Sequence, residues 1–372
     1  MKKIPILLFG AFLPFLPLQS AHAEEQIIQI IGAPHQNFSG VFENDELAQE
    51  LTPAGKLGRL VYVPFSSKKT WLIDPALVDE VVAMTQPYLL INETKPTGTE
   101  IAKAWLDQLK RITVRNNVVA LAYGNPDTRL ANALAPNELK LYYNYGQNQL
   151  QIILGRSVQN ASNGNWGLGK SKLDGEQVRS YSTNRKSLTK LIKVVNDPAL
   201  TLMRVKLARL LSPTLNKSAK IYFSKNADVV VSEQMHKLRI TPGKYQITTE
   251  SAKLPVTVIN EFPVDVFVAI SMVPKNSRVR VENIGSVLIP AQSKKQLEIQ
   301  LNVVAPGQTV IEAKIKDPSG VQISETSILQ INSTVIDKRV TWFTTGAAIL
   351  LLLAAIAQSV RRVRKGRINE NQ

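Results

Sequence analysis

A long uncharged stretch near the C-terminus constrains this chain more than any other feature. Residues 340–360 contain no charged side chain, and at about 1.5 Å per residue a helix of that length spans the roughly 30 Å hydrocarbon core of a membrane. Five basic residues follow directly, namely Arg361, Arg362, Arg364, Lys365 and Arg367. Because basic flanks stay in the cytoplasm, we expect a transmembrane helix at 340–360 and a cytoplasmic tail at 361–372.

The N-terminus has the three-part layout of a secretory signal peptide, in a form typical of bacteria. Lys2 and Lys3 precede an apolar run over residues 4–18, and the small residues Ala21 and Ala23 mark a cleavage site. We expect residues 1–23 to be removed, because the apolar run is short for a membrane span. The mature protein is then single-pass in the cell membrane, with its body outside and its C-terminus in the cytoplasm.

The composition excludes several classes of chemistry. The chain has no cysteine, which excludes thiolate catalysis, cysteine metal sites and disulfide partners. Its three histidines are His22, His35 and His236, and the first lies in the signal peptide, so we expect no metal and no cofactor. Without disulfides, an exported body of this length must depend on buried apolar cores.

Positive charge is concentrated in the middle of the chain. The formal charge is +16, and residues 155–220 hold many Lys and Arg against only Asp174, Glu176 and Asp197. Outside a bacterium this segment would face anionic wall polymers, anionic lipids or an acidic protein, and we expect no nucleic-acid partner. A solvated basic surface without a ligand is the alternative.

Strand and helix signals alternate from residue 59 onwards. Strands are expected at 59–65, 70–74, 118–123, 140–147 and 149–156, and helices at 75–84, 100–112, after 124, at 186–195 and at 198–211. Pro75 and Thr99 suit the starts of the first two helices. This order predicts an α/β domain at 59–236 with a mainly parallel sheet, which a short β-rich lead-in at 24–58 precedes.

From residue 237 the helical signals stop and apolar and polar residues alternate with a period of two. Leu297, Ile299 and Leu301, for example, are separated by polar residues. Short strands over 237–335, directly before the membrane, predict an immunoglobulin-like β-sandwich that acts as a stalk. The expected fold class is α+β multidomain, with an α/β domain, then the sandwich, then one C-terminal transmembrane helix.

A carboxylate ends the strand at 70–74, and carboxylates at such positions are catalytic in many α/β enzymes. Asp127 follows the next strand, so Asp74 and Asp127 could converge on a glycan as an acid/base pair. The alternative is that Asp74 caps the helix that Pro75 begins. The same tetrapeptide, Asp-Pro-Ala-Leu, recurs at 197–200 without a strong strand before it. This repetition favours the cap, so we assign no catalytic residue and keep the two carboxylates as candidates.

The expected helix at 198–211 carries three basic residues beside an apolar face. Such a helix can lie on a membrane surface, although more often it packs on a sheet. Because Arg204, Lys206 and Arg209 fall within the basic segment, they are the candidate ligand-binding residues.

Several stretches resemble a family of exported actinobacterial proteins without an assigned function. They are "TWLIDPALVDEV", the "W-L-x-x-L" pattern that begins at Trp105, "VVALAYGNPD" and "LPVTVINEFPVDVFVAI", together with the final apolar helix and its Arg-rich tail. The resemblance implies a single-pass membrane protein, often encoded beside a MurJ-like lipid II flippase. Family members usually have a larger α/β portion, and the family supplies no established catalytic residues.

Three hypotheses for the function remain. The first is a non-catalytic, membrane-anchored cell-envelope protein that binds or positions an anionic wall polymer or the machinery for lipid-linked wall precursors. The second is a glycan-active hydrolase or deacetylase that uses Asp74 and Asp127. The third is a structural subunit of a membrane complex, held by small residues such as Gly346 and Ala347 of the transmembrane helix.

Overall fold

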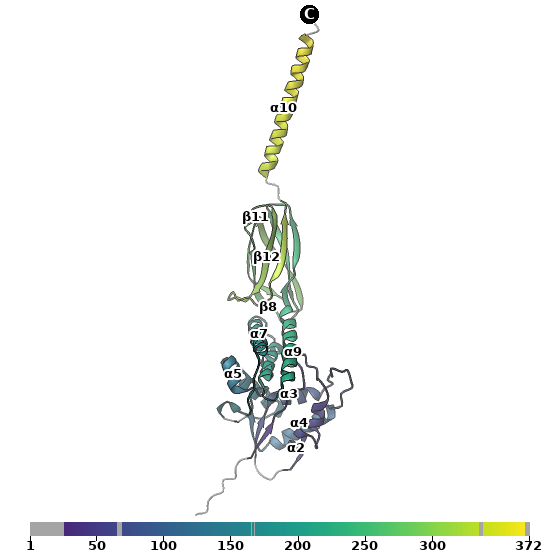
Figure 1. Cartoon of the computed structure of the whole chain (residues 1–372), viewed down its shortest axis with the longest axis vertical. Coiled ribbons are helices and arrows are strands. Elements are labelled where there is room, and N and C mark those ends of the chain that lie inside the picture. The colour runs from purple at the N-terminus through teal and green to yellow at the C-terminus, as the bar shows by residue number, and fades with distance from the viewer. Residues whose placement is uncertain (1–25, 65–68, 165, 167, 335–337, 369–372) are drawn as a thin grey trace, which may run out of the picture.

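The computed structural model describes residues 26–64, 69–164, 166, 168–334 and 338–368 (Figure 1). The predicted signal peptide at 1–23 lies outside the described residues, as do residues 369–372 of the predicted tail. The described chain combines helices and sheets and ends in one long apolar helix, as the sequence predicts.

Four strands of the N-terminal half form one sheet in the order β1-β2-β3-β4, and each neighbouring pair is parallel. They are β1 (Gln26–Ile30), β2 (Lys69–Ile73), β3 (Asn117–Ala120) and β4 (Gln159–Asn160). The connections contain α1 (Glu46–Leu51), α2 (Lys56–Tyr62), α3 (Pro75–Met84), α4 (Thr99–Thr113), α5 (Thr128–Leu134) and α6 (Pro136–Leu154). Parallel neighbours need such crossovers, and the helices also bury the apolar side chains of the strands.

Two stretches expected to be β-structure are helical instead. The lead-in at 24–58 contains α1 and the beginning of α2 as well as β1, and the strand expected at 59–65 is helical as far as Tyr62. Leu57 and Val61 are four residues apart and buried, which places them on one face of α2. Packing of this face onto α4 outweighs the local β-propensity.

The two strands expected within residues 140–156 are one helix, α6. Tyr142, Gly146 and Leu150 are buried at a spacing of four residues, which is the spacing of a helix face. Gly146 lies where α6 approaches the end of β3. A Cβ atom added there would be 2.8 Å from the carbonyl oxygen of Leu121, so the glycine permits close packing.

Between β4 and the next strand, the described residues form three α-helices and two 3-10 helices. They are η1 (Ala161–Asn163), α7 (Gly175–Ile192), α8 (Pro198–Lys206), η2 (Leu207–Leu211) and α9 (Lys217–His236). The start of α7 precedes the expected start at residue 186, because Asp174 and Gln177 form a capping box there. Helix α9 was not expected at all. Similarly, Thr99 is the first residue of α4 and not its cap, which is Gly98.

The C-terminal half is built from two sheets, with strand orders β10-β8-β12-β13-β6 and β5-β7-β11-β9. The strands are β5 (Leu238–Ile240), β6 (Gly243–Ile247), β7 (Ser251–Asn260), β8 (Val266–Pro274), β9 (Val279–Val281), β10 (Ile284–Ile289), β11 (Ser293–Val303), β12 (Gly307–Lys316) and β13 (Ser327–Ser333). Leu297, Ile299 and Leu301 of β11 are buried, so the predicted alternation is confirmed.

The largest apolar cluster joins the helices to the sandwich. Leu188 of α7 and Phe223 of α9 belong to the same cluster as Val258 and Leu329 of the two sheets. Figure 1 shows α7 and α9 side by side, between the first sheet and the sandwich. The helix pair is therefore held in one continuous core with the strands that follow it.

Helix α10 (Lys338–Ile368) ends the described chain. Its segment Thr344–Arg361 is exposed and is long and apolar enough to cross a membrane, which agrees with the expectation for residues 340–360. In Figure 1 it extends from the end of the sandwich opposite to the first sheet.

The close approach at Gly146 predicts that Gly146→Ala destabilises the protein. The added methyl group must displace backbone of β3, which costs about 1–3 kcal/mol. We expect a lower melting temperature by circular dichroism. Gly285→Ala is the matched control, because a Cβ atom at Gly285 meets nothing within 4 Å. Equal melting temperatures for the two variants would contradict the packing of α6 against β3.

Candidate functional site

Asp74 is the N-cap of α3. Its Oδ1 atom accepts hydrogen bonds from the backbone N–H of Ala76 and of Gly124, each at 2.9 Å. The second Asp-Pro-Ala-Leu copy does the same, because Asp197 caps α8 through the N–H of Ala199 at 2.9 Å. The repeated tetrapeptide is thus a helix-start signal in both places, which confirms the cap.

Asp74 is also deeply buried, at 4 % exposure. Burial raises the pKa of its carboxyl group to about 7, and the hydrogen bonds from Ala76 and Gly124 and the charge of Arg209 only partly oppose this rise. The Asp74 carboxyl group therefore holds the end of β2, the start of α3 and the turn after β3 together, away from solvent.

Arg209 and Glu80 form a buried ion pair beside Asp74. The distance from Arg209 Nη1 to Glu80 Oε1 is 2.8 Å, and their side chains are 3 % and 1 % exposed. Arg209 also donates to the carbonyl oxygens of Gln36 and Ala76, at 3.2 and 3.3 Å. Glu80 in turn accepts from the backbone N–H of His35 at 3.0 Å and of Gln36 at 3.2 Å.

The cavity next to this pair is too small for a ligand. Its volume is about 10 Å³, which is about the space that one water molecule needs. Arg209 thus connects η2 to α3 and to residues 35–36 inside the protein, and it does not reach a ligand at the surface.

Of the other two expected ligand-binding residues, Arg204 is used internally and Lys206 is partly buried. The Nε atom of Arg204 donates to Glu138 Oε2 at 3.0 Å, and Arg185 contacts the same carboxylate at 3.4 Å. Lys206 is half-buried, and burial followed by the charge of Arg209 lowers the pKa of its amine to about 8. The structure therefore does not place Arg204, Lys206 and Arg209 together on one accessible surface.

Asp127 is the N-cap of α5 and is 8 % exposed. Its Oδ1 atom accepts from the N–H of Arg129 at 3.0 Å and of Leu130 at 3.2 Å, and its Oδ2 atom accepts from the N–H of Ser171 at 2.7 Å. Asp127 borders a hollow beside α5, whereas Asp74 borders the small cavity at Arg209. The two carboxylates thus do not converge on one cavity.

An exposed basic face lies on α7 instead, and we call it the α7 face. It consists of Arg179, Lys186, Lys190 and Lys193, the last being the C-cap residue. Their spacings of seven, four and three residues bring the side chains onto one side of a helix. Within the described part of the chain, none of the four forms an ion pair with an acidic side chain. The Asp174 and Gln177 capping signal would have revealed this face in the sequence, because it moves the helix start ahead of Arg179.

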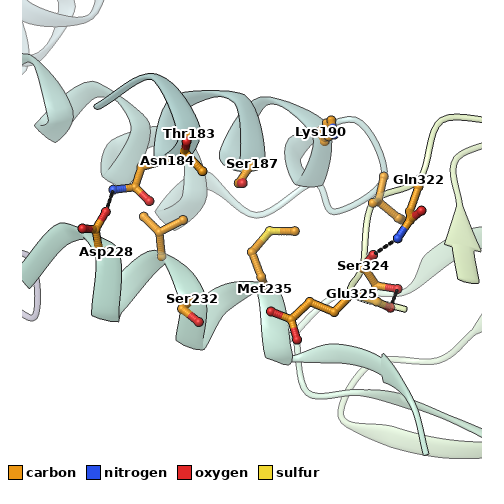
Figure 2. A pocket seen from close by; sticks show the side chains of 12 residues that line it. Thr183, Asn184, Ser187, Lys190, Asp228, Ser232, Met235, Gln322, Ser324 and Glu325 are labelled. Carbon is orange, nitrogen blue, oxygen red and sulfur yellow. Dashed lines mark hydrogen bonds between the residues drawn. The ribbon is translucent and has the colours of Figure 1, made fainter. Parts of the chain in front are cut away.

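A groove of about 620 Å³ runs between α7 and α9, and residues 322–325 of the sandwich close one end (Figure 2). Asp228 lines it and accepts from Asn184 Nδ2 at 2.7 Å, as Figure 2 shows. Glu325 adds a second carboxylate, and Lys190 is the cation among the lining residues. These two carboxylates make the groove unfavourable for an anion. An anion is better accommodated along the α7 face, which meets the groove at Lys190.

The raised pKa of Asp74 predicts a pH-dependent effect of Asp74→Asn. The folded protein retains a proton that the unfolded chain, with an ordinary pKa of 3.8, releases between about pH 4 and 7. The contribution of the protonated Asp74 side chain to the free energy of unfolding is complete below pH 4 and is lost as the pH rises to about 7. Asparagine keeps the Oδ1 acceptor and carries no charge.

Asp74→Asn should therefore be more stable than the wild type at pH 8, and the difference should shrink towards pH 4. Melting temperatures across this range would measure it, with Asp197→Asn at the more exposed copy as the control. A difference that stays constant with pH would show that Asp74 is not buried as a protonated acid.

The likenesses to solved structures involve about a quarter of the chain. A C. elegans MSP family member, WR4, is 17 % identical over 26 % of this chain and 98 % of its own, with a TM-score of 0.20. The PapD-like domain 7 of human CEP192 is 14 % identical over 27 % and 87 %, with a TM-score of 0.22. The E. coli chaperone DraB is 12 % identical over 26 % and 55 %, with a TM-score of 0.20. No curated protein matches the sequence.

A family model does match, and it covers residues 143–367. The match begins in α6 and runs through α7, α8, α9 and the two sheets into α10. The family is described as one of unknown function, which confirms the expectation of an uncharacterised family. Because more than half of the chain is matched, the protein belongs to the family of unknown function DUF6049.

Proposed function

We propose that this protein is a non-catalytic, single-pass component of the bacterial cell envelope that binds an anionic wall component through the α7 face. In this proposal residues 1–23 are a cleaved signal peptide and residues 361–372 are cytoplasmic. A parallel α/β domain and an immunoglobulin-like sandwich lie outside the membrane. The candidate span in α10 supports the anchor.

The observation that carries the proposal is the set of unpaired cations on α7. Arg209 is buried and Arg204 is partly buried, and both pair with internal carboxylates. By contrast, the α7 face, with Arg179, Lys186, Lys190 and Lys193, is exposed. Each exposed cation near an anionic surface contributes about 1 kcal/mol. Four of them in one row match a polymer with repeating negative charges better than a compact ligand with a single charge.

The contacts of the two candidate carboxylates support a non-catalytic protein. Asp74 is buried and caps α3, and both oxygens of Asp127 accept hydrogen bonds from backbone amides. A general acid or base needs to reach the proton that it transfers, and these carboxylates are occupied in holding the fold.

The resemblance to exported actinobacterial proteins encoded beside a MurJ-like flippase supports a setting near wall synthesis. A protein in that setting would meet wall polymers or the machinery for lipid-linked wall precursors. The sandwich lies between the α7 region and α10, so it would act as the stalk that holds the α7 face away from the membrane (Figure 1).

The proposal predicts that the full chain, purified in detergent, co-sediments with bacterial cell walls. Binding should require the anionic polymers of the walls and should weaken as salt screens the charges. Replacing Arg179, Lys186, Lys190 and Lys193 by Gln should weaken binding at least about tenfold at low salt.

The matched control removes the same charge elsewhere, by Gln substitution at the exposed residues Lys56, Lys95, Arg111 and Arg115. This control should bind nearly as well as the wild type. If both variants lose binding equally, net charge and not the α7 face is responsible. If neither loses it, or if walls without anionic polymers bind equally well, the proposal is wrong.

A further inference from the structure

A second hollow lies where the chain leaves β3 and β4. Its volume is about 560 Å³, and its walls come from α5, from α6 and from the loop after β4 that reaches Lys170. Ligands of parallel α/β sheets bind at the carboxyl ends of the strands, and this volume lies within the range of small-molecule sites. We call this hollow the α5 pocket.

Two aromatic side chains form part of its wall. Tyr143 comes from α6 and Trp166 from the loop, and both pack at the edge of the cluster that contains Val119. The indole Nε1–H of Trp166 donates to the carbonyl oxygen of Ala161 at 3.0 Å. A Cβ atom at Gly164 would be only 2.3 Å from this nitrogen, so the glycine allows the ring to lie close to the backbone of residue 164.

The polar groups in the α5 pocket are free to contact a ligand. Arg129, Asn132 and Lys170 are exposed, and their side chains have no hydrogen-bond or ion-pair partner among the described residues. The hydroxyl group of Tyr143 likewise has no partner within the described ranges. An anion would thus meet two cations, an amide and a phenol.

The acidic residue of the pocket does not cancel this positive charge. Both oxygens of Asp127 accept from backbone N–H groups, as described above, and the charges of Arg129 and Lys170 exceed its single charge. The positive charge of Lys220 also acts on Asp127. The Nζ atom of Lys220 donates to Ser171 Oγ at 2.6 Å.

These contacts also hold the pocket open before a ligand arrives. Ser171 is tied to α5 through Asp127 and to α9 through Lys220, so one end of the loop is fixed. The Trp166 bond to Ala161 fixes the other. A preformed wall lowers the ordering cost of binding, which favours a real site over a shallow surface feature.

We propose that the α5 pocket binds a sugar ring that carries an acidic group, either a carboxylate or a phosphate. The apolar face of the ring would stack on Trp166 or Tyr143, the hydroxyl groups would bond to Asn132 and the tyrosine, and the acid would pair with Arg129 and Lys170. The proposal deepens the proposed function, on which it rests for the source of the sugar, and it adds a site that recognises single units of the polymer.

The test uses ¹⁵N NMR of the indole N–H groups in the full chain in detergent. Of the four tryptophans, Trp71 and Trp105 are fully buried, Trp342 is exposed on α10 and Trp166 lines the pocket. Trp166→Phe identifies the signal of Trp166. The probes are D-glucuronate, glucose 1-phosphate and glucose. We expect the Trp166 signal to shift with at least one acidic sugar, with glucose at least about tenfold weaker. The stronger acidic probe identifies carboxylate or phosphate as the group that is recognised.

Replacing Arg129 and Lys170 by Gln should reduce the affinity for the acidic sugar about tenfold, towards that of glucose. Both side chains are exposed, so the fold should persist, and the melting temperature checks this. Gln substitution at Lys56 and Arg115 is the matched control and should leave the affinity unchanged. No shift of the Trp166 signal with any probe, equal affinity for glucose, or no effect of the Arg129 and Lys170 substitutions would each overturn the proposal.

The two proposals fail separately. If the acidic sugar binds to the α5 pocket and walls do not bind to the α7 face, the proposed function is wrong and the pocket remains. If walls bind through the α7 face and the Trp166 signal does not respond, the pocket proposal is wrong and the proposed function remains.

Discussion

The buried ion pair between Arg209 and Glu80 is the contact on which the arrangement of the helices depends. Two charges inside a protein are strongly destabilising unless they are paired and hydrogen-bonded. Arg209 belongs to η2, Glu80 to α3, and residues 35–36 supply backbone groups that bond to both side chains, while the Nε atom of Arg209 is buried without a hydrogen-bond partner among the described residues. The pair therefore fixes where η2, and with it the start of α9, sits against the first sheet. The Arg209 side chain also explains why position 124 is a glycine, since a Cβ atom there would be 2.9 Å from the Arg209 side chain.

The sequence predicts the elements that depend on local signals, but not the contacts between residues that are far apart in the chain. Helix α3, strand β11 and helix α10 depend on local signals, namely an Asp-Pro start, a period of two and an uncharged run, and each lies where the sequence predicts it. The sequence does not predict helix α6, because its tyrosines favour strands locally. The helix forms because it packs against β3. Arg209 and Glu80 are far apart in the sequence, so no local pattern joins them. The separation of Asp74 from Asp127 was hidden for the same reason.

The basic segment shows a similar division between composition and structure. The sequence locates the excess charge within residues 155–220, but burial decides which cations can reach a ligand. Arg204 and Arg209 each meet a carboxylate from a distant helix, and that pairing removes them from the surface. Among the residues that the structure describes, Lys186 and Lys190 have no such partner, and both are exposed. Net charge thus identifies residues 155–220 as the basic segment, whereas the contacts of each side chain identify the cations that a ligand can reach.

The basic residues of α7 are carried on a helix that is packed against the sandwich. Leu188, on the inner side of α7, belongs to the same apolar cluster as Leu329 of the sandwich. Because protein cores are close-packed, α7 and the sandwich move together. A polymer bound to the exposed side of α7 would therefore be held at a fixed height, which is its distance from the end of the sandwich that faces α10. A helix carried on a flexible linker would bind the same charges without setting that height. Under the proposed function, the shared core would therefore allow the α7 face to position a wall component as well as to bind it.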